Sequence, residues 1–183
     1  MEFRKLNIGC GFSEDGTHFI DLYPRRDEVL KYDADTDKIP FEDNYFDEVI
    51  AEFIFEHLKD RKLFLSEVKR VLKVNGKFTM LTDNAGFLPY HNCKSKTKTH
   101  YGGYDYYGKG GEADSHYSLF TFDHIQRFLE EEGFETEVIL YNRDKFGWKV
   151  NVALFILNLT RFKWMSKAMI KGIGVKRDET KTV

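Results

Sequence analysis

Short apolar runs alternate with polar turns through the first half of the chain, which is the pattern of buried strands. Five runs have strand length, at residues 1–8, 18–22, 29–32, 46–51 and 77–82. The first run leads into a glycine turn, and the next three lead into acidic or polar residues. If these strands are parallel, we expect their polar ends to share one edge of a sheet.

Helical spacing occurs before the fifth run and again near residue 121. Asp60 is suited to be the N-cap of a first helix, and Asn75-Gly76 supplies its stop. The apolar positions of this helix are Phe64, Val68, Val71 and Leu72. Thr121 begins a second helix that ends at Gly133 and precedes a strand over residues 134–141. This alternation predicts an α/β fold with a mostly parallel sheet and helices on both faces.

The N-terminal part of this pattern is short. No helical segment precedes the first strand, and residues 12–16 are polar and too few for the crossover helix that usually joins parallel strands. We therefore expect the first crossover to be a loop.

We expect the chain to form a single domain, residues 1–183, with three parts. Residues 1–83 form the cofactor-binding half suggested by the strands above, and residues 84–120 form a variable segment that is rich in Gly, Tyr, His and Lys and has no sustained period. Such a long loop is functional or disordered, and its many tyrosines favour a functional role. Residues 121–183 hold the second helix, the strand and a basic tail.

The tail has a helix-like pattern after the apolar stretch that begins near Phe146. One face would carry Phe162, Met165, Met169 and Ile173, and another would carry Lys163, Lys167 and Lys171. Two interpretations stay open: a helix packed on the core with solvated lysines, or an interfacial helix in peripheral contact with an anionic membrane. Trp164 lies among the lysines, which weakens the second interpretation.

Composition narrows the setting. The net charge of −2 argues against a dedicated nucleic-acid binder. With two cysteines, Cys10 and Cys93, and no recognisable signal sequence, we expect a reducing, cytoplasmic location without disulfides. The longest apolar run, residues 152–157, is far shorter than the ~20 residues that span a bilayer.

The loop after the first strand, Gly9-Cys10-Gly11, would let a ligand approach the bare backbone. In a dinucleotide-binding fingerprint a third glycine would stand where this chain has Glu14, and a helix N-terminus would receive the pyrophosphate. Both features are missing from the pattern, which disfavours a nicotinamide-dependent oxidoreductase.

An ordered set of short motifs follows this loop. The set consists of Asn7-Ile-Gly9-Cys-Gly11, Asp21 at a strand end, Asp33-Ala34 after the next strand, Ile39-Pro-Phe41-Glu-Asp-Asn44-x-Phe46-Asp47, and Phe55-Glu56-His57-Leu58. As a set it resembles the S-adenosylmethionine-dependent class I methyltransferases, and most closely their type 11 group. The resemblance covers about half of the chain, from Leu6 to roughly Asp83, and implies a Rossmann-like sheet that binds S-adenosylmethionine over the carboxyl ends of its strands.

The resemblance also implies roles for individual residues. The implied cofactor-binding positions are Asn7, Gly9, Cys10, Gly11, Asp21, Leu22, Asp33, Ala34, Glu52, Phe53 and His57. The glycines would lie near the aminoacyl part, and Asp21 would accept both ribose hydroxyls. Asp33 and Ala34 would contact the adenine, while Glu52 and Phe53 would lie near the methionine moiety and the reacting methyl.

Each position also has an ordinary structural interpretation. The glycines could form a plain tight turn, and Asp21 could be a solvated strand end. Asp33 could cap a turn. Glu52 could be a surface acid, and His57 a histidine that only orients its loop.

Histidines and other potential ligands gather in the variable segment, namely His91, Cys93, His100, Asp114 and His116. Their spacing matches no strong zinc pattern, so no metal site is expected. His116 or His91 could act as a general base toward a hydroxyl or amine acceptor, or these could be loop histidines without a role.

The sequence therefore predicts methyl transfer from S-adenosylmethionine to an acceptor that the residues do not identify, with a small molecule or glycan favoured. The competing hypothesis is a non-catalytic protein of the same fold that binds S-adenosylmethionine or a partner.

Overall fold

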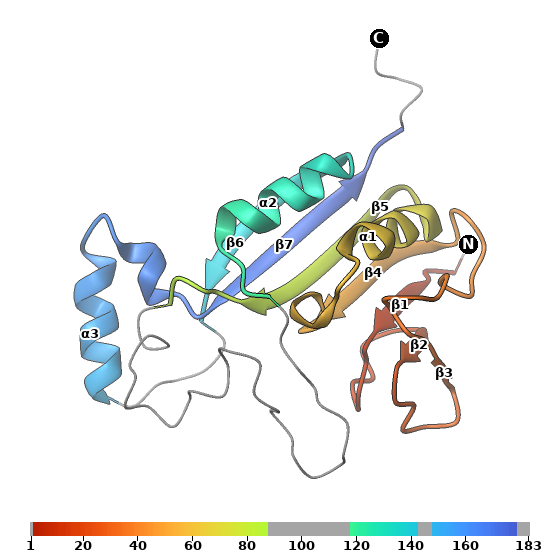
Figure 1. The fold of residues 1–183 in the computed structure, drawn as a ribbon, viewed down its shortest axis with the longest axis horizontal. Helices are drawn as coiled ribbons and strands as arrows, with labels where there is room; N and C mark the ends of the chain where they lie inside the picture. The colour runs from red at the N-terminus through yellow and green to blue at the C-terminus, as the bar shows by residue number, and fades with distance from the viewer. Residues whose placement is uncertain (1, 88–117, 143–147, 179–183) are drawn as a thin grey trace.

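One seven-stranded sheet organises the molecule in the computed structural model, which describes residues 2–87, 118–142 and 148–178. The strand order is β3-β2-β1-β4-β5-β7-β6 (Figure 1). The strands are β1 (Lys5–Ile8), β2 (His18–Asp21), β3 (Val29–Lys31), β4 (Phe46–Glu52), β5 (Leu72–Asp83), β6 (Phe134–Tyr141) and β7 (Met169–Lys176). The helices are η1 (Phe55–His57), α1 (Arg61–Val71), α2 (Phe122–Glu131), α3 (Trp148–Asn158) and η4 (Lys163–Ser166).

The first five strands pair in parallel. β1 lies at the centre of this half, between β2 and β4, and β5 continues it beyond β4. The carboxyl ends of all five strands therefore meet at one edge, as the polar strand ends predicted. This arrangement confirms the Rossmann-like, mostly parallel α/β fold.

The prediction of a basic C-terminal helix in the tail is wrong, because residues Met169–Lys176 form strand β7. β7 runs antiparallel to β5 on one side and to β6 on the other (Figure 1). Met169 and Ile173 are four residues apart and share a face in a strand as well as in a helix, so their spacing alone could not separate the two. The glycine at 172 lets α2 pack closely on this strand, because a Cβ there would lie 2.8 Å from Ile125 Cγ2.

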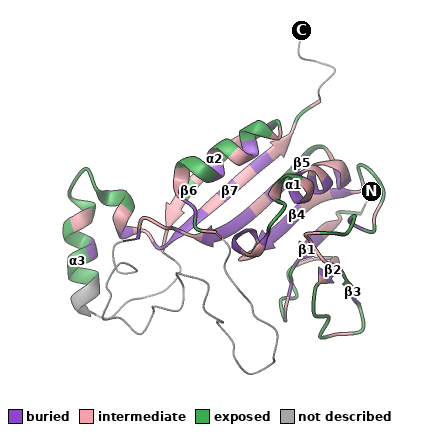
Figure 2. Ribbon diagram, in the orientation of Figure 1, coloured by how far each residue is buried: buried purple, intermediate pink, exposed green. Residues whose placement is uncertain are grey.

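Both long amphipathic helices cover the same face of the sheet (Figure 1). The Phe64 ring of α1 lies 6.3 Å from the Phe78 ring of β5, and Leu129 of α2 lies over Gly172 of β7, where an added Cβ would be 3.0 Å from Leu129 Cδ1. β5 and β7, which lie beneath them, mix buried residues with intermediate or exposed ones (Figure 2), and the buried ones include Phe78, Met80 and Ile170. Of the two helical layers expected, the described residues form this one; α3 lies beyond the end of the sheet, against η4.

The two helices begin where the sequence predicted. Asp60 Oδ1 accepts the Leu63 N–H at 2.9 Å, and at Thr121 the backbone N–H donates to His124 Nδ1 at 3.3 Å. However, α1 ends at Val71, before the expected stop. Asn75, at a φ of 64°, instead kinks the long strand β5.

The loop expected in place of the first crossover helix is also confirmed. Residues 9–17 between β1 and β2 form a loop without a helix, and residues 22–28 between β2 and β3 form another. The ends of these strands are therefore joined by short, polar connections.

Candidate functional site

The loop after β1 depends on two glycines in the left-handed region, Gly9 at a φ of 64° and Gly11 at 53°. A Cβ at Gly9 would lie 2.3 Å from Ile54 Cδ1, so a neighbouring side chain requires this glycine. A Cβ at Gly11 would meet nothing within 4 Å. The backbone at Gly11 thus faces open space at the carboxyl edge of the sheet, where a ligand can approach it.

Asp21 ends β2 beside this loop. Its Oδ2 accepts the Gly11 N–H at 2.9 Å, and its Oδ1 accepts the Tyr23 N–H at 2.8 Å. Each carboxylate oxygen can accept about two hydrogen bonds, so each keeps one acceptor direction beyond these contacts. The fixed carboxylate suits a pair of adjacent hydroxyl groups, which is the chemistry of a ribose.

Two further predicted residues support the loop from beneath. Asn7 is buried, and its Nδ2 donates to the Asp15 carbonyl at 3.0 Å. Cys10 is also buried, and burial raises the pKa of its thiol. Arg26 Nη2 donates to the Ser13 carbonyl of the same loop at 2.8 Å. Asn7 therefore contacts the loop rather than open space, while Leu22 is exposed beside Asp21.

The acidic segment after β3 folds into a turn. Asp33 Oδ1 accepts the Asp35 N–H at 3.0 Å, so the turn-capping interpretation describes this oxygen's contact. Ala34 packs partly against the main core. Sequence reasoning missed Asp35, whose Oδ1 accepts the N–H groups of Lys59 and Asp60 and ties this turn to the start of α1. The only signal was its place in a run of acids at a strand end.

Residues after β4 have a strained connection. Phe53 has a φ of 56°, although it is not a glycine, and its N–H donates to the Leu81 carbonyl at 2.8 Å. Strain of this kind gathers at functional sites. Glu52 is exposed just before it, and His57 is half-buried at the end of η1, where its N–H donates to the Ile54 carbonyl.

Glu56 is a buried acid that sequence reasoning did not include in the site. Its Oε2 accepts from the Thr82 hydroxyl at 3.1 Å, and its carbonyl accepts the Ser118 N–H. Its side chain therefore joins η1 to the carboxyl end of β5, close to the candidate site. The motif Phe55-Glu56-His57-Leu58 was the available signal.

The predicted catalytic histidines, His116 and His91, lie outside the described residues, as do Cys93, His100 and Asp114. Among residues 2–87, 118–142 and 148–178, no group of three His, Cys, Asp or Glu side chains could hold a metal ion. The two described ends of the variable segment lie side by side, because the Ala85 N–H donates to the Phe120 carbonyl at 2.8 Å.

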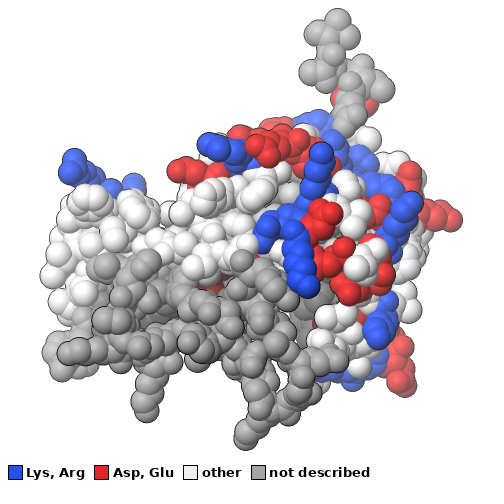
Figure 3. Space-filling model, in the orientation of Figure 1, with Lys and Arg blue, Asp and Glu red and all other residues white. Residues whose placement is uncertain are grey.

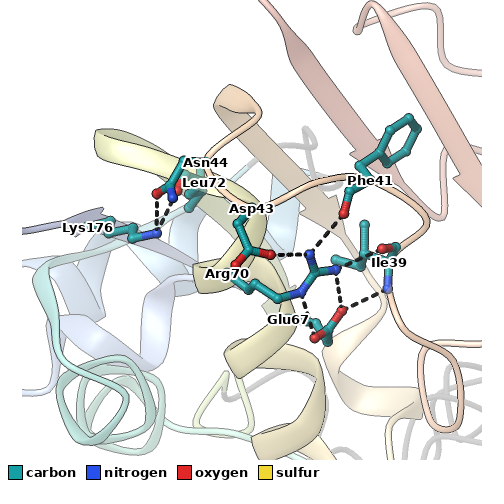
Figure 4. A network of polar contacts seen from close by, with 8 residues as sticks. All are labelled: Ile39, Phe41, Asp43, Asn44, Glu67, Arg70, Leu72 and Lys176. Carbon is teal, nitrogen blue, oxygen red and sulfur yellow. Dashed lines mark hydrogen bonds and ion pairs between the residues drawn. The ribbon is translucent and has the colours of Figure 1, made fainter.

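A second polar network serves the fold at the opposite edge of the parallel strands (Figure 4). Arg70 of α1 donates to both oxygens of Glu67 and to the carbonyls of Ile39 and Phe41. The hydrogen bonds from Arg70 hold the pKa of Glu67 below its usual range. An open hollow lined by residues 38–43 and Arg70 lies here, away from the glycine loop, so we assign it no part in the candidate site.

Comparison with known proteins gives one family match. Residues 18–80 match the family described as methyltransferase domain. A similar curated protein is the ubiquinone/menaquinone biosynthesis C-methyltransferase UbiE of Paraburkholderia xenovorans, 43% identical over 48 residues. That match covers 26% of this chain and 20% of UbiE, so the shared region spans only about a fifth of the relative.

Solved structures agree on the fold. A methyltransferase from Thermotoga maritima matches with a TM-score of 0.65 at 16% identity, over 97% of this chain and 84% of that chain. Phosphoethanolamine N-methyltransferase 2 from Haemonchus contortus, in complex with S-adenosyl-L-methionine, matches with a TM-score of 0.60 at 19% identity. This second match covers 97% of this chain and 49% of that chain.

Proposed function

We propose that this chain, a member of the class I, type 11-like methyltransferases, transfers a methyl group from S-adenosylmethionine to an acceptor. The observation that carries the proposal is the pairing of Gly11 and Asp21: a backbone open to a ligand beside a carboxylate with spare acceptor capacity. The family match over residues 18–80 and the fold shared with methyltransferases support it.

The residues present fit this cofactor. Asp21 would accept the two ribose hydroxyls, and the open backbone at Gly11 would lie against the aminoacyl part. Asp33 and Ala34 would line the adenine side, and Phe53 the methyl side. When bound, S-adenosylmethionine supplies an electrophilic methyl group on a positively charged sulfur. The chain itself contributes by holding the two reactants in line, and that alignment lowers the barrier.

We place the acceptor in the class of small molecules or glycans. Similar proteins named for ubiquinone or menaquinone biosynthesis and for phosphoethanolamine support a small-molecule class. The tyrosine-rich segment at residues 84–120 supports a ring-bearing acceptor, because aromatic side chains offer flat faces for stacking. His116 or His91 would serve as the general base if the acceptor needs deprotonation.

Titration calorimetry with S-adenosylmethionine tests the proposal first. We expect the wild type to bind and Asp21→Ala to bind about 1–3 kcal/mol more weakly, because two ribose hydroxyls lose their acceptor. Asp27→Ala, which removes an exposed acid nearby, is the matched control and should bind like the wild type. Unchanged affinity in folded Asp21→Ala would exclude the assigned ribose position.

Transfer of labelled methyl groups to a panel of small-molecule and glycan acceptors tests turnover. The non-catalytic alternative, a protein that only binds S-adenosylmethionine, predicts binding with no transfer to any acceptor. Absence of binding would reject both.

A further inference from the structure

Helix α3 has apolar side chains both on the side that packs against the protein and on the side that faces solvent. Its inner side contributes Leu154 and Leu157 to a small cluster with Phe87, Ala168 and Met169. Its outer side is bare, with three large apolar residues exposed, Val152 51%, Phe155 64% and Ile156 58%, and Leu159, 73% exposed, follows in the turn just after the helix. A helix that is apolar all round is ordinarily buried, so this one has an outer face without a partner among the described residues.

These four residues form one continuous stripe. Val152, Phe155 and Ile156 follow the spacing i, i+3 and i+4, which places side chains along a single side of a helix. Leu159 continues the run from the next turn, where its N–H donates to the Ile156 carbonyl. Two half-exposed aromatic residues of the following segment, Phe162 at 44% and Trp164 at 42%, extend the apolar surface. We call these six residues the α3 patch. Figure 2 shows the outer side of α3 as almost entirely exposed.

The patch is held in a fixed place by polar side chains. Asn84, buried at the end of β5, donates from Nδ2 to the carbonyls of Trp164 and Lys167 at 3.1 and 2.7 Å. Ser166 Oγ donates to Asn158 Oδ1 at 3.0 Å, which joins η4 to the end of α3. The α3 patch is therefore presented by an anchored structure. It adjoins the candidate site, because Phe53 packs against the same small cluster.

The segment that carries the patch has charges of one sign. Residues 146–167 contain four Lys or Arg and no Asp or Glu, although the whole chain has 30 acidic and 28 basic residues. Arg161 and Lys163, both exposed, follow the outer stripe directly. Figure 3 shows this flank as uncharged except for Lys and Arg side chains at its end. Apolar insertion next to basic residues is the arrangement of a surface that binds anionic lipid.

We propose that the α3 patch docks the protein on an anionic membrane surface, with the outer stripe inserted at the headgroup boundary and Arg161 and Lys163 against lipid phosphates. A second copy of the chain fits less well, because a two-fold contact through this segment would bring basic residues together with no acid to pair them. In the described parts of the chain, no helix has the length and apolar character to cross a bilayer. The docking that we propose is peripheral, because the exposed stripe lies on one side of the helix, and it does not depend on methyl transfer.

Co-sedimentation of the full chain with vesicles tests the proposal. We expect binding to vesicles of phosphatidylcholine with phosphatidylserine, weaker binding to phosphatidylcholine alone, and loss of binding as salt rises. Trp164 belongs to the α3 patch, so the tryptophan fluorescence of the chain should shift to the blue on binding. No binding to the anionic vesicles would overturn the proposal.

Paired variants test whether the patch makes the contact. Phe155→Ser with Leu159→Ser should lower the partition coefficient by about tenfold or more. Leu30→Ser with Ile139→Ser removes two other exposed apolar side chains, 46% and 40% exposed on β3 and β6, and should leave binding unchanged. Circular dichroism verifies that each variant is folded. Equal binding by the patch variant and the control variant would overturn the assignment.

A second test variant and its control examine the basic residues. Arg161→Glu with Lys163→Glu should abolish the preference for phosphatidylserine, whereas Lys31→Glu with Lys62→Glu, on exposed positions of β3 and α1, should retain it. Sedimentation equilibrium tests the second-copy alternative. A dimer that the double variant Phe155→Ser with Leu159→Ser dissociates, together with no vesicle binding, would replace the membrane by a second copy as the partner of the patch.

Discussion

Two carboxylates of this molecule, Glu67 on α1 and Asp21 at the end of β2, are surrounded in opposite ways. Glu67 is paired with a cation: Arg70 donates to both of its oxygens, at 2.9 and 2.7 Å, and the Ile39 N–H donates at 2.9 Å. Asp21 accepts only two backbone N–H groups and makes no ion pair with any other described residue. A neutralised acid fastens chain segments together, whereas an acid with spare acceptors at a strand edge is available to a ligand.

The largest expected effect comes from breaking the ion pair between Glu67 and Arg70. Arg70→Ala leaves Glu67 with its side chain 8% exposed and without its cation, which should lower the free energy of unfolding by about 3 kcal/mol. Urea unfolding measures this loss. Lys62→Ala, an exposed position on the same helix, is the control. The affinity of the folded variant for S-adenosylmethionine should stay at the wild-type value, and a parallel loss of affinity would erase the distinction between the two acids.

Substitutions of the two loop glycines should have effects of intermediate size on the free energy of unfolding, and they separate a packing role from a ligand-facing one. Gly9→Ala combines a left-handed φ with a clash against Ile54, so it should lower the free energy of unfolding by roughly 2–3 kcal/mol. Gly11→Ala has open space for its Cβ and should lose only about 1 kcal/mol. Chemical denaturation compares them.

Adding Ile54→Ala to Gly9→Ala should restore part of the loss, because it removes the clash. The same Ile54 change should do nothing for Gly11→Ala beyond its own effect. We expect S-adenosylmethionine binding to be weakened more by Gly11→Ala than by the small loss of stability explains, and an unchanged affinity would remove Gly11 from the ligand surface.

The smallest expected effect is the pH dependence of the stabilisation by the ion pair between Glu67 and Arg70. Hydrogen bonds from Arg70 lower the pKa of Glu67 below its ordinary value of 4.5. The stabilisation by Glu67 is therefore fully present well above pH 4.5 and is lost as the pH falls through the lowered pKa of the folded state. Wild type and Glu67→Gln should differ most in unfolding free energy near neutral pH and converge in acid. Glu42→Gln, an exposed acid nearby, should show no such convergence, and a constant gap for Glu67→Gln would contradict the assignment.

The local pattern was sufficient for elements whose signals are local. Strands β1 to β4, the N-caps at Asp60 and Thr121, and the stop at Gly133 follow from apolar spacing and capping chemistry. The order of the motifs was sufficient to indicate the family. The tail was not predictable in this way, because Met169 and Ile173 share a face in either conformation and only pairing with β5 and β6 selects the strand.

By itself, the sequence determined that a glycine loop follows a first strand and that acids stand at the ends of later strands, since these depend on residue types at short spacing. Tertiary structure decided what each of these residues does. It gave Gly9 a packing role against Ile54 and left Gly11 open, turned Asp35 and Glu56 into links between segments, and exposed the α3 patch. These outcomes depend on neighbours distant along the chain, and local spacing carries no information about which neighbours arrive.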